Sequence, residues 1–245
     1  MCRMMVQVGG TPNGAAMDDF RSLAASGNVL PGNTCGHGDG WGFAALRGGT
    51  VTLFIKSEKD GATDPAFATA AAVVESCGAD IVIGHLRKAS VGDLTPANAH
   101  PFFHGRYVFC HNGGIKESER IPIYGLTPMG QTDSERFFLN IVGRIESGEV
   151  KTLREACEAA VRTIHEGHKY SSISFIISDG EETLVWRDYR DMLQPGEAKP
   201  QNWDVWPEYY TLYRSSKARA VSSQPLPHLA DDWQLMPLRQ FVALD

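Results

Sequence analysis

Paired apolar runs joined by tight glycine turns most constrain the fold of this chain. Gly48-Gly49 separates Trp41–Leu46 from Val51–Ile55, and a second glycine turn, Ser178-Asp179-Gly180, lies between two more apolar runs. Short apolar runs on either side of such turns predict antiparallel strand pairs. The second pair of predicted strands is Ile173–Ile177 and Thr183–Trp186.

Segments with helical spacing alternate with these strands. The predicted helices are Met17–Ala25, a helix that opens at Asp64-Pro65 and ends near Gly78, Thr132–Ile145 and Thr152–His165. The last two open with Thr-x-x-Glu, a capping-box pattern. Further strands are predicted at Ile81–His85, Arg106–Cys110, Tyr210–Leu212 and Ala220–Ser222, with a long surface excursion over Tyr189–Pro207. Strands, helices and strands in this order, with hairpins between neighbours, favour an antiparallel α+β fold over a parallel doubly wound sheet.

Length and charge exclude several classes of protein. The 245 residues are expected to form a single domain, 1–245, because large-sheet folds reach this length as one unit. The formal net charge of −6 and the lack of a Lys or Arg block exclude a nucleic-acid binder. No apolar run approaches the roughly 20 residues that cross a bilayer. Five scattered cysteines without an export signal predict reduced thiols in a cytoplasmic protein.

The second residue, Cys2, is a candidate nucleophile. Aminopeptidases generally remove Met1 when a small residue follows it, so the mature chain is expected to begin with a thiol beside a free α-amine. The reference pKa values are about 8.5 for the thiol and 7.7–8.0 for the amine, so moving the proton from sulfur to nitrogen costs only about 1 kcal/mol. Nucleophile and base then come in one residue. The alternative is a small side chain near a frayed chain end.

Two charged residues are candidates for binding a small zwitterion. Arg87 follows an apolar strand, and a guanidinium there either forms a surface ion pair or grips a carboxylate with two parallel hydrogen bonds. Asp133 lies at a predicted helix start, where it either belongs to the cap or faces a cleft and holds an ammonium group.

Asn112-Gly113 follows another predicted strand. Asn-Gly is a strong hairpin signal. The Asn112 amide and the Gly113 backbone N–H could also form an oxyanion hole, in which one donor is typically worth about 3–4 kcal/mol of barrier. The two interpretations are compatible, because a tight turn exposes a backbone N–H.

A run of histidines suggests a metal site, but its spacing argues against one. The histidines are His37, His85, His100, His104 and His111. None forms an H-E-x-x-H pattern, and Pro101 breaks the His100/His104 pair as a helical ligand face. We therefore predict neither a metal ion nor an organic cofactor. Gly36–Gly42 also lacks the ending of a phosphate-binding loop.

Six segments, taken in order, carry a family resemblance. They are the start Met1-Cys2-Arg3, HGDGWG at 37–42, GHLRKAS at 84–90, NAHPF at 98–102, HNG at 111–113 and TDSE at 132–135. Together they resemble the class II, N-terminal nucleophile glutamine amidotransferases. Within that family they are most similar to the stand-alone group that includes the γ-glutamyl hydrolase of ergothioneine biosynthesis. The resemblance covers residue 2 to about residue 145.

The resemblance implies a four-layer αββα sandwich of two antiparallel sheets, with Cys2 starting an inner strand. It implies that Cys2 is the nucleophile and that its α-amine is the base. Asn112 and Gly113 would form the oxyanion hole. The substrate would be held at its α-carboxylate by Arg87 and at its α-ammonium by Asp133, with Ser90 in the same binding site.

The expected activity is cleavage of the γ-amide of glutamine or of a γ-glutamyl small molecule through a Cys2 thioester. Several alternatives stay open at this stage. A separate synthase partner could receive the ammonia, or the enzyme could act alone as a γ-glutamyl hydrolase on a specific metabolite. Two further rivals are a catalytically silent glutamine-binding regulator and a metal hydrolase that uses the histidines.

Overall fold

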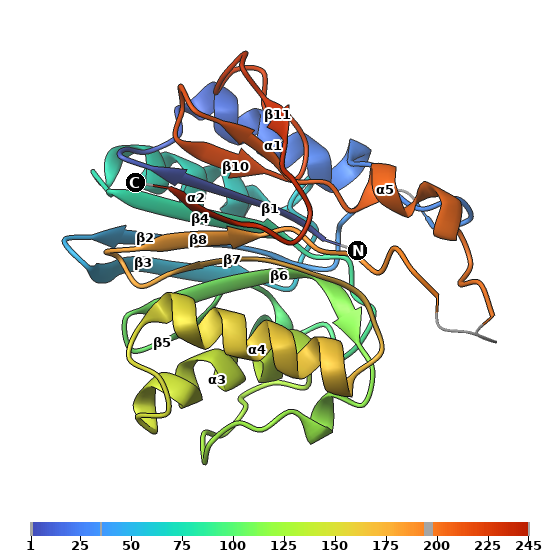
Figure 1. Cartoon of the computed structure of the whole chain (residues 1–245). Helices are drawn as coiled ribbons and strands as arrows, with labels where there is room; N and C mark the ends of the chain where they lie inside the picture. The colour runs from blue at the N-terminus through green and yellow to red at the C-terminus, as the bar shows by residue number, and fades with distance from the viewer. Residues whose placement is uncertain (1, 35, 194–197, 245) are drawn as a thin grey trace.

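The structure is a computed structural model that describes residues 2–34, 36–193 and 198–244. The main helices and strands form four layers: α1 and α2, a seven-stranded sheet, a five-stranded sheet, and then α3 and α4 (Figure 1). The strands pair antiparallel in both sheets. This arrangement confirms the α+β, αββα fold class expected from the sequence.

The seven-stranded sheet has the order β11-β9-β10-β1-β4-β2-β3. Its inner strand β1 pairs with β10 on one side and β4 on the other, so that Met5 lies opposite Ser222 and Gly84. The resemblance correctly placed an inner strand directly after Cys2. The strand bounds are β1 (Arg3–Val8), β2 (Trp41–Arg47), β3 (Thr50–Ser57), β4 (Ile81–Leu86), β9 (Tyr213–Ser215), β10 (Ala220–Ser222) and β11 (Gln234–Leu235).

The five-stranded sheet has the order β12-β8-β7-β6-β5. The predicted hairpin around Gly180 is present as β7 and β8, which pair from Phe175 opposite Trp186 to Ser178 opposite Thr183. Four strands, β5, β9, β11 and β12, have no counterpart at their positions in the predictions. The strand bounds are β5 (Phe102–His104), β6 (Tyr107–Ile115), β7 (Tyr170–Ser178), β8 (Thr183–Trp186) and β12 (Phe241–Leu244).

The helices begin where side chains cap their free N–H groups. Their bounds are α1 (Gly14–Ser26), α2 (Pro65–Ser76), α3 (Asp133–Glu146), α4 (Leu153–Gly167) and α5 (Trp206–Tyr209). α1 starts three residues before the predicted Met17, because the Asn13 side chain accepts a hydrogen bond from the Ala16 N–H at 2.8 Å. At α4, Thr152 and Glu155 form the predicted capping box.

The capping box predicted at the start of α3 is only half formed. The Thr132 hydroxyl accepts from the Glu135 N–H at 3.2 Å, as predicted. The Glu135 carboxylate, however, accepts from the N–H groups of Met129 and Gly130 at 2.8 and 2.7 Å. The loop before α3 offers these donors, so Glu135 holds this loop instead of completing the box.

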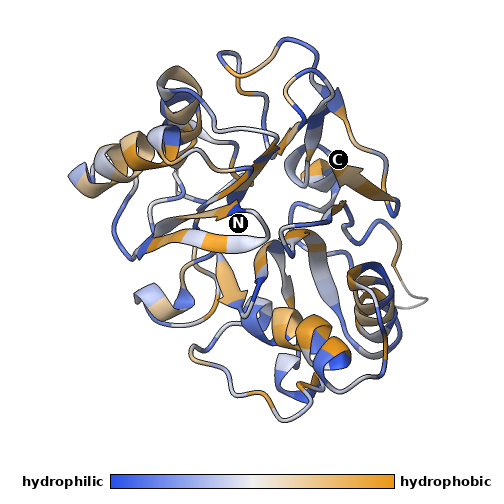
Figure 2. Cartoon of the chain, turned by 90° about the vertical axis from the view of Figure 1, so that its left-hand side faces the viewer, coloured by the Kyte–Doolittle hydropathy of each residue, from blue (hydrophilic) through white to orange (hydrophobic). Residues whose placement is uncertain are grey.

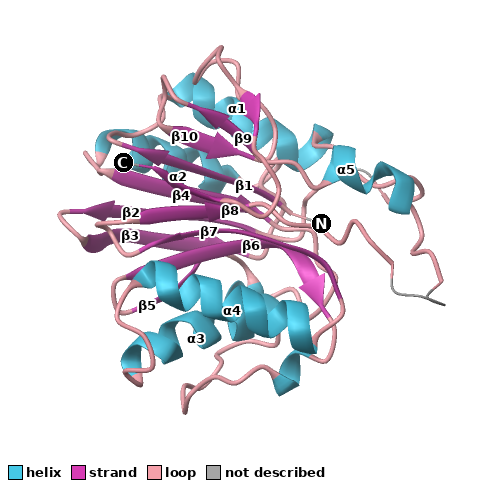
Figure 3. Cartoon of the chain, in the orientation of Figure 1, coloured by secondary structure: helices cyan, strands magenta, loops and turns pink. Residues whose placement is uncertain are grey.

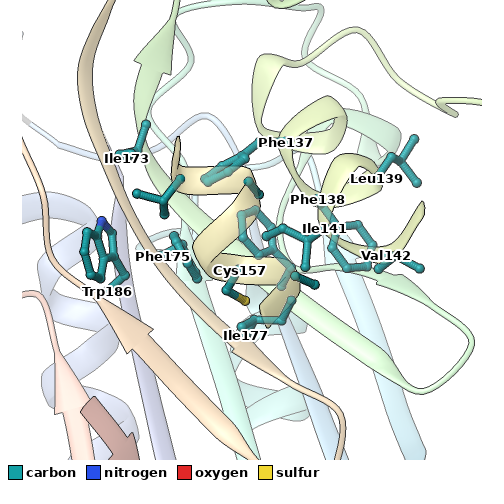
Figure 4. Packing of buried hydrophobic residues seen from close by; sticks show 14 of the residues in the cluster. Phe137, Phe138, Leu139, Ile141, Val142, Cys157, Ile173, Phe175, Ile177 and Trp186 are labelled. Atoms are coloured by element: carbon teal, nitrogen blue, oxygen red, sulfur yellow. The ribbon is translucent and has the colours of Figure 1, made fainter. Parts of the chain in front are cut away.

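The four layers create three apolar interfaces. Because successive side chains of a strand point to opposite faces, one strand can contribute to two of them. Along β1, Met4 and Val6 pack between the two sheets, whereas Met5 packs under α1 and α2. The third interface lies between the five-stranded sheet and α3 with α4. There Phe137 packs edge-on against Phe175 at 5.5 Å between ring centroids (Figure 4). In Figure 2 helices on different sides of the molecule carry both hydrophobic and hydrophilic segments, as helices with one buried face do.

The strand predicted at Tyr210–Leu212 is wrong, since β9 begins at Tyr213. Tyr210 belongs instead to an aromatic cluster with Tyr189 and the helix α5, and its ring lies 5.4 Å from Trp206. This cluster includes Tyr189, Trp203 and Trp206 of the predicted Tyr189–Pro207 excursion, whose residues 194–197 lie outside the described ranges. Figure 3 shows α5 to one side of the sheets, at the same end of the molecule as the start of β1. No helix in the described ranges is long and apolar enough to cross a membrane.

The buried carboxylate of Asp64 ties α2 to β2 and β3. Its Oδ1 caps α2 by accepting from the Ala66 N–H at 3.1 Å. Its Oδ2 accepts from the Trp41 indole N–H at 3.0 Å and from the Ser57 hydroxyl at 2.8 Å. Burial opposes the charged form, yet these hydrogen bonds hold the pKa of Asp64 below its ordinary value.

Replacing this carboxylate should destabilise the fold. We expect Asp64→Ala to lower the free energy of unfolding by about 2–4 kcal/mol. A lost cap costs about 1 kcal/mol and an unpaired buried indole N–H about 1–3. Because the folded pKa is depressed, the ionised carboxylate stabilises above the unfolded pKa of about 3.9, and this contribution is lost as the pH falls through the folded pKa. Urea unfolding of Asp64→Ala should therefore show a weaker loss of stability in acid than the parent protein.

The matched control is Asp18→Ala, at an exposed position on α1. It should change the free energy of unfolding by less than about 0.5 kcal/mol. Equal stabilities of the two variants would contradict the role given to Asp64.

Candidate active site

Cys2 lies at the entrance to β1, buried at 8% exposure. Its backbone N–H donates to Asn112 Oδ1 at 2.9 Å, which links the seven-stranded sheet to β6 of the other sheet. Its thiol faces the carbonyl of Lys88 at 3.7 Å, just beyond the end of β4. Because burial disfavours the thiolate, the pKa of Cys2 is raised. The thiol therefore needs a base before it can attack.

Arg3, to which the sequence motifs assigned no role, holds the backbone of Cys2 in place. Its side chain is fully buried, and its Nη1 donates to the Cys2 carbonyl at 3.1 Å. Its Nε donates to Gln224 Oε1 at 3.0 Å, Nη2 donates to the Asn28 carbonyl, and its guanidinium lies over the Tyr209 ring. A buried arginine bonded to several fixed acceptors is a rigid support for the neighbouring residue. In the sequence, the only signal of this role is the position of Arg3 beside Cys2.

Asn112 and Gly113 lie inside β6, so the hairpin turn predicted there is wrong. β6 continues to Ile115, with a register irregularity between Gly113 and Ile115 where it pairs with β7. A Cβ at Gly113 would lie 1.7 Å from the Ser172 carbonyl oxygen, so only glycine fits there. The chain thus departs from regular pairing through a bulge instead of a turn.

The Asn112 amide is oriented by its neighbour. Since its Oδ1 accepts from the Cys2 backbone N–H at 2.9 Å, its Nδ2 points away from the Cys2 nitrogen. Asn112 is 1% exposed. A fixed donor beside the thiol is the arrangement that an oxyanion hole needs.

Arg87 directly follows β4 and is 2% exposed. Its Nη1 donates to the Asp93 carbonyl at 3.2 Å, and its Nη2 donates to the carbonyls of Val91 and Gly92 at 2.8 and 3.4 Å. These three bonds occupy three of the five guanidinium donors. No carboxylate of the described residues pairs with Arg87, so this buried cation lacks a counter-ion.

The loop that Arg87 holds is tied down at both ends. At its start, Asp39 Oδ2 accepts from the Ala89 N–H at 2.8 Å, and the Lys88 ammonium donates to the Thr34 carbonyl at 3.0 Å. At its end, Asn98 donates to the Asp93 carbonyl at 3.1 Å. The glycine-dense segment and the NAHPF segment therefore serve to hold the Arg87 loop, a role that sequence reasoning missed.

Asp133, at the first position of α3, is 4% exposed. Its Oδ2 accepts from the Ile115 N–H at 2.6 Å, just past the bulge in β6. In the ranges that the structure covers, no Lys, Arg or His side chain forms an ion pair with it. Asp133 thus belongs to the helix start and also presents a buried carboxylate.

Buried histidines pack at the site, and His100 and His111 line the space beside Cys2. The Nε2 of His111 faces the Ser172 carbonyl at 3.2 Å, so it carries the proton, and Nδ1 accepts from the Ser134 hydroxyl at 2.8 Å. Burial lowers the pKa of His111 and of His100, and lowers that of His85 to about 3. These rings are therefore neutral near pH 7. No group of three metal-ligating side chains occurs among the described residues.

One small cavity brings together five of the six predicted site residues. It has a volume of about 20 Å³ and is lined by Cys2, Arg87, Ser90, Gly113 and Asp133, among others. Asn112 joins them through its bond to Cys2. A space of this size holds about one water molecule. Val91 lines the cavity as well, and both Ser90 and Val91 belong to the loop that Arg87 holds.

A larger chamber of about 420 Å³ adjoins this cavity. Ser90, Val91, Gly113 and Asp133 line both spaces. The chamber extends outward past Trp206, from α5, and past the side chains of Lys116, Lys169, Tyr170 and Arg190. The site therefore consists of a narrow end at the thiol and a wider approach.

Comparisons with known proteins agree with this geometry. The sequence profile of the class II glutamine amidotransferases matches residues 1–238. An uncharacterized protein of Methanocaldococcus jannaschii is 30% identical over 158 residues, which are 63% of this chain and 44% of that protein. A glutamine–fructose-6-phosphate aminotransferase of Xylella fastidiosa is 35% identical over 101 residues, or 40% of this chain and 16% of that one. The chain thus spans less than half of the length of these relatives.

A solved structure shows the same fold. The glutamine phosphoribosylpyrophosphate amidotransferase of Bacillus subtilis superposes with a TM-score of 0.63 at 13% identity, over 99% of this chain and 47% of that chain. The profile match covers nearly the whole sequence, and the fold is that of the family. The chain therefore belongs to the class II glutamine amidotransferases and is an enzyme of that family.

Proposed function

We propose that this enzyme cleaves the γ-amide of glutamine or of a γ-glutamyl compound through a thioester on Cys2. One observation carries the proposal: a thiol, a buried cation and a buried anion converge on one cavity. Arg87 and Asp133 have no partner of opposite charge among the described residues. Buried charges are normally paired. The α-carboxylate and α-ammonium of a glutamyl group would supply both missing partners.

The base in this proposal is the α-amine of Cys2 itself, freed by removal of Met1. Burial raises the pKa of the Cys2 thiol, so at neutral pH the thiol keeps its proton until the amine takes it. The Cys2 nitrogen already lies 2.9 Å from Asn112 Oδ1, and a free amine there could keep this hydrogen bond. The bond would hold the nitrogen beside its own sulfur.

The reaction then follows from the positions of the donors. Cys2 Sγ bonds to the γ-carbon, and the developing oxyanion is stabilised by Asn112 Nδ2 and the Gly113 N–H. The α-ammonium of Cys2 gives its proton to the leaving nitrogen as the C–N bond breaks, which leaves a glutamyl thioester. Water, with the amine again as base, cleaves the thioester and releases glutamate. None of these steps uses a metal ion or an organic cofactor.

The α-carboxylate and α-ammonium end of the substrate is held by Arg87 with the loop after it and by Asp133 at the start of α3. Arg87 keeps two free guanidinium donors for the α-carboxylate, Asp133 accepts from the α-ammonium, and Ser90 lines the space between. Because the cavity at the thiol holds about one water molecule, the substrate approaches through the adjoining chamber, and loop residues 88–93 shift to admit it.

The whole chain, residues 1–245, is proposed to act as a single amidotransferase domain. Ammonia could pass to a separate synthase, because relatives with longer chains are named as aminotransferases. The second candidate, a γ-glutamyl hydrolase with a bulkier leaving group, is favoured by the 420 Å³ chamber, whose volume far exceeds that of the cavity at the thiol. Glutamate release from a series of γ-glutamyl amides, with glutamine as reference, separates the two candidates.

The nucleophile is tested by Cys2→Ala. We expect glutamate release from glutamine to fall by at least about 1,000-fold, since removal of a nucleophile leaves only binding and oxyanion stabilisation. Cys77→Ala, at the half-buried cysteine that ends α2, should keep full activity. Undiminished release from Cys2→Ala would remove Cys2 from the mechanism. Thermal stabilisation by glutamine without any release from the parent protein would indicate a silent binding protein.

The base is tested by keeping Met1 in place. Protein that retains Met1, as verified by intact mass, should release no glutamate, because an amide nitrogen cannot accept the thiol proton. Treatment with a methionine aminopeptidase should restore activity together with the loss of one methionine mass. Full activity before this treatment would contradict the α-amine as base.

The proposed binding of the α-ammonium by the Asp133 carboxylate is tested by Asp133→Asn, which keeps an acceptor for the Ile115 N–H. We expect KM for glutamine to rise by about 10- to 100-fold, since a hydrogen bond to a charged group contributes about 1.5–3 kcal/mol. Glutaramate, which lacks the α-ammonium, should be cleaved equally well by the variant and the parent enzyme. Asp18→Asn serves as the control, and a similar loss with glutaramate would show that Asp133 acts only on the fold.

A further inference from the structure

A second cavity, of about 350 Å³, opens at the side of the sandwich. It lies where the edge strands of the two sheets, β3 and β5, face each other, and it reaches the first turns of α3. None of its lining residues also lines the cavity at Cys2. Most of its wall is apolar: Phe54, Phe102, Phe103, Pro96, Met129, Phe138 and Leu139.

Lys56 is the one lysine in this wall and stands at an inward position. Along β3, Leu53 and Ile55 pack under the helices, whereas Phe54 packs between the sheets. The alternation of a strand places Lys56 on the same side as Phe54. Its ammonium lies over two rings, 5.1 Å from the centre of Phe102 and 5.4 Å from that of Phe54.

This ammonium has no anionic contact. Within the described residues no carboxylate lies in ion-pair distance of Lys56. Burial lowers the pKa of Lys56 to about 8, and the nearby charge of Glu135 only partly offsets that effect. Both Glu135 oxygens already accept from the N–H groups of Met129 and Gly130. The Glu135 carboxylate also lines the cavity and partly offsets this charge, so the cavity combines apolar walls with a cation that no carboxylate of the described residues contacts.

An inward-pointing lysine on an edge strand also protects that edge from pairing with another chain. Such a role accounts for the charge on β3. It does not account for a cavity walled by aromatic rings, nor for the exposure of Phe103 (48%) and Met129 (87%) beside it. Apolar side chains that gather around a concave space are typical of a site for a small ligand.

We propose that this cavity is a second ligand site, for a small apolar carboxylate such as an arylalkanoate. The carboxylate would pair with the Lys56 ammonium, and the apolar body would lie against Phe102, Phe138 and Leu139. The site is separate from the amidase reaction, so its test does not depend on the activity proposed above.

The experiment uses a matched pair of ligands, phenylpropionate and its uncharged amide, phenylpropionamide. Each is titrated by calorimetry into the full-length protein without glutamine. The carboxylate should bind at least about tenfold more tightly than the amide, as expected for a charge-assisted hydrogen bond. Lys56→Met should weaken carboxylate binding by a similar factor and leave amide binding unchanged. Lys56→Arg should retain the preference for the carboxylate.

The control variant is Lys151→Met, at an exposed lysine before α4, and it should bind both ligands as the parent protein does. Circular dichroism and size-exclusion chromatography establish that each variant is folded and monodisperse. Equal affinity of the parent protein for the two ligands, or no binding of phenylpropionate at millimolar concentration, would overturn the proposal. Unchanged carboxylate binding by a folded Lys56→Met protein would do the same.

Discussion

The hydrogen bond between the Cys2 backbone nitrogen and Asn112 Oδ1 is the contact on which the rest of the site depends. It joins the residue just before β1 to β6, and so crosses from one sheet to the other at 2.9 Å. The side of Asn112 that accepts this bond fixes where its Nδ2 points. In the proposed reaction, this one bond would position both the amine beside the thiol and the Nδ2 donor beside the γ-carbonyl of the substrate.

The burial of charge at this site opposes stability. Taking an ion out of water costs several kcal/mol unless hydrogen bonds or an opposite charge replace the water. Arg87 recovers part of this cost from three carbonyls, and Asp133 from the Ile115 N–H, but neither meets an opposite charge among the described residues. Local choices that conflict with stability are expected at functional sites. The narrow cavity between them is where both conflicts would be resolved by one zwitterion.

Much of the fold could be predicted, because strand and helix patterns are local. The β2–β3 hairpin around Gly48-Gly49 and the capping box at Thr152 were both predictable from neighbouring residues. Errors arose where distant segments compete. Tyr210 is of a residue type common in strands but packs into the aromatic cluster of α5. Glu135 accepts from N–H groups of the preceding loop instead of completing the capping box of α3. Lys56 shows the same limit, since nothing nearby in sequence shows that its ammonium faces two aromatic rings.

The order of six motifs singled out residues that meet at one cavity, but it did not give their geometry. An Asn-Gly pair predicts a turn because both residues readily adopt the positive φ that a type I′ hairpin turn requires. Here Asn112 and Gly113 stay within a strand, since the Ser172 carbonyl lies so close to Gly113 that no side chain fits. This contact joins residues about sixty positions apart. The supporting roles of Arg3, Lys88 and Asn98 depend on contacts of the same kind, so only the folded chain reveals them.

In the proposed reaction, the guanidinium of Arg87 would couple substrate binding to the shape of the site. The same group that would receive the α-carboxylate holds the carbonyls of Val91, Gly92 and Asp93. Of these bonds, the one to Gly92 is the longest, at 3.4 Å, and is the weakest by geometry. In the proposed reaction the α-carboxylate would take the two free donors of this guanidinium, and a shift of the loop to admit the substrate would break the long bond to Gly92 first. Such a shift would reconcile a cavity that holds about one water molecule with a substrate as large as glutamine.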